Sequence, residues 1–156
     1  MRVYRTNAVL SLNVWDETKA SLEISPALEG NAKGQPQSGE KRYNYDKLIR
    51  ITFTTFDMLL CANKLRQLSE GNPVEYTKFA DLAKVEGSAS TDKKSLKIAP
   101  LDKGGVGISL SRASDRVNIV VSQDDCYALS EWFRVRASKN IEAETRITKQ
   151  DNTPED

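Results

Sequence analysis

Two stretches of the chain collect lysine and arginine side chains. Their basic residues are Lys33, Lys41, Arg42, Lys47 and Arg50 in residues 33–50, and Lys93, Lys94, Lys97, Lys103, Arg112 and Arg116 in residues 92–116. Glu40 and Asp46 oppose the first set, and Tyr43 and Tyr45 are interleaved with it. Cations of this kind can follow phosphate groups, and flat rings stack on unpaired bases at about 1–3 kcal/mol each. The pattern is therefore compatible with a surface for a single-stranded nucleic acid.

Three further aromatic residues are candidates for such a surface. Trp15 follows an alternating apolar segment at a turn, where its ring could stack on a base or pack beneath the turn. Tyr76 and Phe79 lie near Lys78 in residues 74–92, a segment whose secondary structure the pattern leaves open. Because a solvated strand face also carries lysine and arginine, and tyrosine often lies at the rim of a sheet, the residues alone leave a purely structural role open.

The sequence offers little for catalysis. It contains no histidine, which removes the common general base and the usual zinc ligand sets. Asp124 and Asp125 are adjacent where a helix is expected to begin, a position that favours negative charge for structural reasons. Residues 104–107 are glycine-rich but join two expected strands, unlike a phosphate-binding loop, which leads into a helix. We expect no enzyme activity, no metal and no cofactor.

Length and composition favour one domain with a core of ordinary size. The chain has 156 residues and a net charge of +1, while residues 138–156 carry −2 and end in Thr-Pro-Glu-Asp. We interpret residues 1–137 as the domain and residues 138–156 as a polar, acidic-ended tail. Cys61 and Cys126 are expected to be buried reduced thiols, which fits a reducing compartment. No apolar run is long enough to predict a membrane span.

The chain repeats one pattern twice. Residues 19–26 and residues 93–100 share five of eight positions, and residues 49–65 are echoed by residues 117–133. Alternating apolar residues predict strands at 10–14, 22–26, 48–53, 96–100, 106–111 and 117–121. Helical spacing predicts one helix after Thr54 or Thr55 and another after Ser122, whereas residues 29–42 are interpreted as a flexible loop. We therefore predict an α+β fold of two pseudo-repeated antiparallel units, at about residues 8–70 and 92–137.

The motifs in these units resemble the Whirly family of single-stranded DNA-binding proteins. Residues 93–101 read Lys-Lys-Ser-Leu-Lys-Ile-Ala-Pro-Leu and run into a glycine turn and a Leu-Ser strand, as in the second half of that family. Residues 17–22 resemble its Lys-Gly-Lys-Ala-Ala-Leu motif, and residues 42–45 its Tyr-Asp-Trp segment. The resemblance implies two crossed four-stranded sheets, a homotetramer built through the helices, and strand binding along the sheet edges with little sequence preference.

Carried over residue by residue, the resemblance makes Lys19 a phosphate contact or an assembly residue. It makes Lys93, Lys94 and Lys97 its counterparts in the second half, and it places Tyr45 where the family has tryptophan. The chain departs from the family at Glu17 and Thr18, and residues 28–43 lack a long apolar strand, so one strand of the first sheet is expected to be short or missing. No transit peptide is visible, which favours the cytoplasm of a bacterial or phage-infected cell over an organelle.

These observations favour a single-stranded DNA-binding protein of replication, recombination or repair, whose acidic end could recruit partner enzymes. An RNA-binding or RNA-annealing protein on the same fold, a fold of the Pur-alpha type, and a non-catalytic protein adaptor are the alternatives. The predicted contact residues are Trp15, Lys19, Lys41, Arg42, Tyr43, Tyr45, Lys47, Arg50, Tyr76, Phe79, Lys93, Lys94 and Lys97. We also predict that the protein is a homotetramer and that it does not contact membranes.

Overall fold

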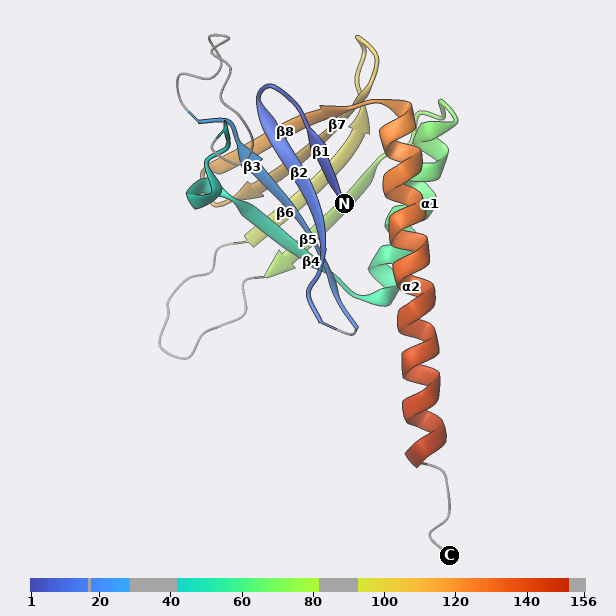
Figure 1. Ribbon diagram of the computed structural model, residues 1–156. Coiled ribbons are helices and arrows are strands. Elements are labelled where there is room, and N and C mark those ends of the chain that lie inside the picture. Colours follow the sequence, from blue (N-terminus) through green and yellow to red (C-terminus); the bar gives the residue numbers. More distant parts are fainter. Residues whose placement is uncertain (17, 29–41, 82–92, 152–156) are drawn as a thin grey trace, which may run out of the picture.

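The computed structural model describes residues 1–16, 18–28, 42–81 and 93–151. Its elements are β1 (Arg2–Tyr4), β2 (Ala8–Val14), β3 (Ala20–Pro26), a 3-10 helix (Tyr45–Lys47), β4 (Ile49–Phe53), α1 (Thr55–Ser69), β5 (Tyr76–Asp81), β6 (Lys93–Pro100), β7 (Val106–Arg112), β8 (Asp115–Val121) and α2 (Gln123–Asp151). Four strands and a helix are thus followed by four strands and a helix (Figure 1). The repeat predicted from the sequence is confirmed as a repeat of supersecondary structure.

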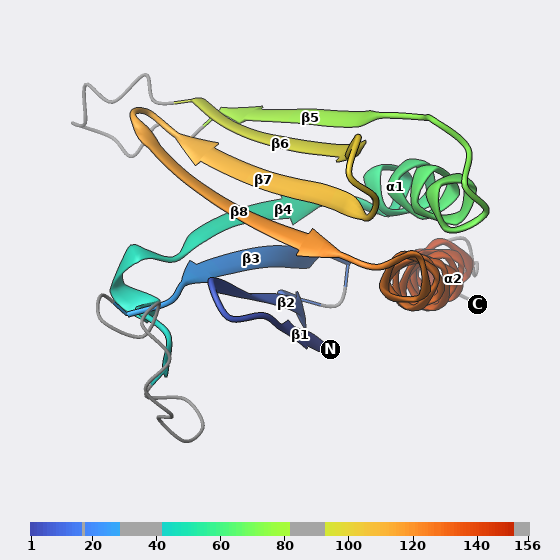
Figure 2. The same ribbon diagram turned by 90° about the horizontal axis from the view of Figure 1, so that it is seen from above.

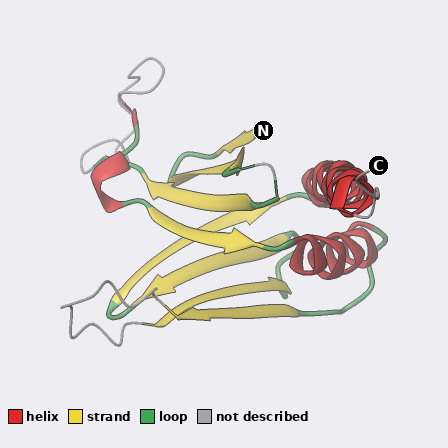
Figure 3. Cartoon of the chain, turned by 90° about the horizontal axis from the view of Figure 1, so that it is seen from below, coloured by secondary structure: helices red, strands yellow, loops and turns green. Residues whose placement is uncertain are grey.

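The strands form two antiparallel four-stranded sheets. The first sheet has the order β1-β2-β3-β4 and the second sheet has the order β5-β6-β7-β8. The strands of the two sheets cross where the sheets meet, and α1 and α2 lie side by side at one end of them (Figures 2 and 3). This is the predicted α+β fold of crossed sheets, with one helix contributed by each half.

The core lies between the inner faces of the sheets and the helix pair. On β4 and β8 every second side chain is buried in this core, and the side chains between them are exposed or only partly buried. Phe53 at the end of β4 and Phe133 in α2 are fully buried, and their ring centroids are 4.9 Å apart. Cys61 and Cys126 are free buried thiols, as predicted, and burial raises the pKa of Cys126 to about 12.

Each helix begins at the residue that its sequence indicates. Thr54 and Asp57 form a capping box at the start of α1, and Ser122 and Asp125 form the same reciprocal pair of hydrogen bonds at the start of α2. The α1 helix buries the predicted stripe of Met58, Cys61, Leu65 and Leu68. It ends before Gly71, whose φ of 85° is favourable only for glycine.

The residues from Ser138 onward, which the sequence assigns to a polar tail, continue α2 as far as Asp151. The physical reason is a tertiary contact: the turn between β2 and β3 docks on this part of α2. Asn140 is fully buried and donates to the Thr18 carbonyl at 2.9 Å, and Arg136 donates to the Asp16 carbonyl at 3.1 Å. The helix is thereby anchored beyond the end of the predicted domain, and its last turns project from the body (Figure 1).

Two strands are absent from the sequence-based prediction. The three-residue strand β1 supplies the fourth strand of the first sheet, which the sequence predicts to be short or missing. The segment at residues 74–92, whose structure the sequence leaves open, contains β5, the edge strand of the second sheet. The predicted loop at residues 29–42 lies outside the described residues except for Arg42.

Asp57 is expected to stabilise the fold above acid pH. Burial alone would raise its pKa, but hydrogen bonds from Lys78 (2.8 Å) and from Thr54 (3.0 Å) hold the pKa below its ordinary value of 3.8. A carboxyl with a lowered folded-state pKa contributes stability above its unfolded pKa, and this contribution is lost as pH falls through the folded pKa. Replacing Asp57 by Asn should therefore cost about 1–3 kcal/mol at pH 7.

Urea unfolding at neutral pH and below about pH 4 measures this effect. The cost of Asp57→Asn should shrink on acidification, because the wild-type carboxyl then becomes protonated. Asp124→Asn is the matched control, since Asp124 occupies the first turn of α2 and is exposed. An equal cost of Asp57→Asn at both pH values would contradict the assignment.

Candidate nucleic-acid interface

The outer face of the second sheet presents two rows of side chains that cross its strands and are polar except for one ring. One row joins Phe79, Ser95, Ser111 and Arg116 in register, and the next joins Thr77, Lys97, Ser109 and Asn118. These residues alternate with the buried ones of the same strands and so face away from the core. Serine, threonine, asparagine and the cations all donate hydrogen bonds, which suits phosphate and base-edge acceptors.

An exposed ring and exposed cations lie on this face. Phe79 is 72% exposed, which is unusual for a phenylalanine side chain, and Lys93 and Lys97 are exposed on the neighbouring strand β6. Lys97 lies 3.9 Å from the exposed carboxylate of Glu75, an ion pair that solvent and salt weaken. The ring can therefore stack on a base, and the lysines can contact phosphates, without a prior loss of strong internal contacts.

Arg116 belongs to this face, although it was not among the predicted contact residues. Its Nε donates to Asn118 Oδ1 at 3.0 Å and its Nη2 donates to Ser109 Oγ at 3.3 Å. These bonds hold the guanidinium over the two rows. The signal was present in the sequence, because Arg116 lies in the basic stretch at residues 92–116 and alternates with the buried Val117 of β8.

On the outer face of the first sheet, Trp15 lies against Arg50. The Arg50 guanidinium carbon is 4.6 Å from the centre of the Trp15 ring, and its Nε forms an ion pair with Glu23 at 2.5 Å. Trp15 is nevertheless 52% exposed. Of the two roles left open for Trp15, the structure supports an accessible ring more than one packed beneath the turn.

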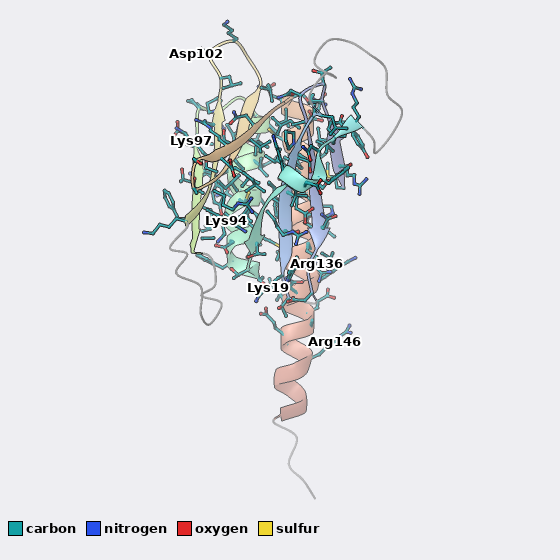
Figure 4. All side chains as sticks on the ribbon, turned by 90° about the vertical axis from the view of Figure 1, so that its left-hand side faces the viewer. Lys19, Lys94, Lys97, Asp102, Arg136 and Arg146 are labelled. Atoms are coloured by element: carbon teal, nitrogen blue, oxygen red, sulfur yellow. The ribbon has the colours of Figure 1, made fainter. Side chains whose placement is uncertain are left out.

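Lys94 lies on the opposite side of the second sheet from Lys97 (Figure 4). It has the same orientation as the buried Leu96, and it pairs in register with Arg112 on β7. Burial first, and then the neighbouring charges of Arg112 and Arg50, lower the pKa of Lys94. Lys94 and Arg112 are neighbours in register, and Arg50 comes from β4, the strand of the first sheet that crosses β6 and β7; the three cations are here called the junction cluster.

Two of the predicted contact rings, Tyr43 and Tyr76, are buried in the structure and present no free face for a base. Tyr43 is 5% exposed, donates its hydroxyl to the Arg5 carbonyl at 2.8 Å and packs beside Tyr4. Tyr76 is 8% exposed on the inner face of β5. Burial raises the pKa of both phenols. Each ring contributes to packing, because the backbone at its position directs it inward.

The remaining predicted residues are dispersed. Lys19 follows the turn between β2 and β3, beside the first turn of α1 and away from Lys97 (Figure 4). Tyr45 is 39% exposed in the 3-10 helix. Lys47 lines a cavity of about 520 Å³ together with Arg112 and Arg116, next to the junction cluster. Arg42 is half-buried and makes contacts of its own, and Lys41 lies outside the described residues.

Within the described residues, no group of three His, Cys, Asp or Glu side chains is arranged to hold a metal ion. None of the helices in that part of the chain is long and apolar enough to cross a membrane.

Comparison with known proteins identifies the fold. No family model matches the chain, and no curated protein matches it significantly. Solved structures do match, among them the plant transcriptional regulator PBF-2 (15% identity, 99% of this chain and 96% of that one, TM-score 0.68), WHY1 from Arabidopsis thaliana (15%, 90% and 89%, 0.63) and WHY3 from Arabidopsis thaliana (14%, 97% and 94%, 0.68). The chain is similar to these proteins in fold over nearly its whole length.

Proposed function

We propose that this chain, which has the Whirly fold, binds single-stranded DNA with little sequence specificity and without catalysis. We place it in DNA replication, recombination or repair, in a reducing compartment such as a bacterial cytoplasm. Its acidic end is proposed to recruit the enzymes of these processes. The fold of the structural neighbours supports nucleic-acid binding, and the residues of this chain support the single-stranded form.

The observation that carries the proposal is the outer face of the second sheet. Phe79 is exposed there on the edge strand β5, Lys93 and Lys97 lie on the neighbouring strand β6, and rows of polar side chains lead from β5 across the sheet to Arg116 on β8. A stacked base must be unpaired, so an exposed ring among cations favours single strands over a duplex. Contacts to phosphates and stacking carry little sequence information, which accounts for the expected lack of specificity.

Fluorescence anisotropy of a labelled thymine oligonucleotide of about 30 bases tests the proposal. Titrations at about 50 mM and about 200 mM salt should show tight binding that weakens steeply, and duplex DNA should compete poorly. An RNA oligonucleotide of the same length, compared at one salt concentration, separates DNA binding from RNA binding. No binding at the lower salt would overturn the proposal in favour of protein recognition.

We also propose that the protein is a homotetramer assembled through α1 and α2. The helix pair exposes apolar side chains that a monomer would leave in water: Phe56, Leu59, Leu60, Tyr127, Val135 and Ile141. Phe56 is 68% exposed, almost as much as Phe79 on the sheet, so the same substitution at each of the two positions gives a matched comparison.

Phe56→Glu should reduce the assembly to a smaller species, because a charge in an apolar interface loses its hydration. Phe79→Glu should leave the assembly unchanged and weaken DNA binding. Light scattering after size-exclusion chromatography measures the first effect, and anisotropy measures the second. A tetrameric Phe56→Glu variant would exclude this part of α1 from the interface.

A further inference from the structure

We propose that the junction cluster, Arg50, Lys94 and Arg112, is a phosphate-binding site that holds one phosphodiester group of the bound strand beside Trp15. Its second-sheet cations, Lys94 and Arg112, face the opposite way from Lys97, and the site joins the two sheets of one subunit. The inference rests on the proposed function and names a second point of attachment for the same ligand.

The backbone brings these cations together. Lys94 on β6 and Arg112 on β7 are paired directly in register. Each lies two residues from a buried leucine of its own strand, Leu96 and Leu110, and so faces the same side of the sheet as that leucine. Arg50 comes from β4, the edge strand of the first sheet, which crosses β6 and β7. The apolar core therefore ends in a group of positive charges, and Arg112 also lines the cavity of about 520 Å³ at this end of the sheets.

The charges of the cluster are only partly compensated. Glu23 forms an ion pair with Arg50. Asp115 faces Arg112 in register, but in the described part of the chain no carboxylate forms an ion pair with Arg112 or with Lys94. Burial, and after it the like charges of Arg112 and Arg50, lower the pKa of Lys94, so the three cations repel one another. A phosphodiester group would relieve that repulsion and accept hydrogen bonds from both guanidinium groups.

Trp15 extends the site from phosphate to base. Arg50 already lies over one face of its ring at 4.6 Å, and the residue is half exposed. A nucleotide whose phosphate lies on the cluster can therefore stack its base on Trp15, and Arg50 can contact both parts of it. Lys78, the other inward-facing lysine of the second sheet, does not belong to the site because it is ion-paired with Asp57 at 2.8 Å.

Anisotropy with the thymine oligonucleotide tests the site through Lys94→Gln combined with Arg112→Gln. We expect an affinity loss of about tenfold or more at low salt and a shallower dependence of log affinity on log salt, by about 0.7 for each phosphate contact removed. Lys103→Gln with Lys139→Gln is the control of equal charge, since both residues are exposed and lie elsewhere. Circular dichroism establishes that each variant is folded.

A pH series gives an independent readout. As pH rises through the lowered pKa of Lys94, the wild-type protein should lose affinity earlier than Lys94→Arg, whose guanidinium stays charged. The other charged side chains around the site are Arg112, Arg50, Glu23 and Asp115, and they are the same in both proteins. Quenching of Trp15 fluorescence by the oligonucleotide in a Trp132→Phe background would report the stacked base.

The outcomes separate the two proposals. If wild type fails to bind, the proposed function is wrong. If wild type binds and the folded Lys94→Gln/Arg112→Gln variant keeps both its affinity and its salt dependence, the phosphate site is wrong and the function stands. An identical response of wild type and Lys94→Arg to pH would likewise overturn the phosphate site and leave the function standing.

Discussion

Reversing the charges of Lys93 and Lys97 together should weaken binding to a thymine oligonucleotide by about a hundredfold or more at low salt. Both side chains are exposed on β6 and project from the outer face of the second sheet. The double variant Lys93→Glu/Lys97→Glu replaces two attractions to phosphate with two repulsions, beside the ring of Phe79. Anisotropy at about 50 mM salt measures the loss.

A control variant with the same change in net charge distinguishes the loss of a local contact from a general electrostatic effect on the DNA. Lys103→Glu with Lys139→Glu changes the net charge by the same amount, at the β6–β7 turn and on α2. We expect it to retain most of the affinity, because exposed charges beyond about 10 Å are largely screened at 0.1 M salt. Unchanged affinity in a folded Lys93→Glu/Lys97→Glu protein would remove the outer face of the second sheet from the interface.

Truncating Phe133 to alanine should cost about 3–5 kcal/mol of stability. Phe133 is fully buried in α2, its ring lies 4.9 Å from that of Phe53, and Trp132 packs on it edge-on at 5.5 Å. These contacts tie α2 to the first sheet, so the cavity left behind would lie where the helix pair meets both halves. Thermal unfolding should show a fall in Tm of roughly 10 °C.

Tyr45→Ala is the comparison for this effect. Tyr45 is 39% exposed and lies in the 3-10 helix, away from the helix pair, so its loss should change stability by less than about 1 kcal/mol. Equal effects of the two substitutions would mean that the α2 packing described above does not anchor the fold.

The fold could be predicted in large part because its signals are local. Capping residues Thr54 and Ser122 mark the helix starts, and the spacing of Met58, Cys61 and Leu65 marks a buried face. The missed elements lack such signals. Three residues are too few for β1 to show a period. The last turns of α2 are mostly polar and show no apolar stripe, so that only the contact of Asn140 with Thr18 shows why the helix extends there.

The candidate site could be predicted only at the level of residue types. Phe79 and Tyr76 are both aromatic and lie three residues apart, yet one is 72% exposed and the other is buried. Their opposite orientation follows from the two-residue period of β5, and without a recognised strand the sequence could not assign it. The burial of Tyr43 is likewise not visible in the local sequence, because the carbonyl that its hydroxyl contacts belongs to Arg5, far away in the chain.

Local sequence patterns were enough to specify the repeated α+β architecture, the helix starts, and an abundance of cations and rings suited to phosphates and bases. Which of these side chains act together depends on how the sheets pack. Lys93 and Lys94 are adjacent and chemically identical, but the pleat of β6 directs Lys93 outward and Lys94 inward. Lys94 meets Arg50 because two sheets cross there, and a crossing angle is a property of packed surfaces that no local pattern encodes.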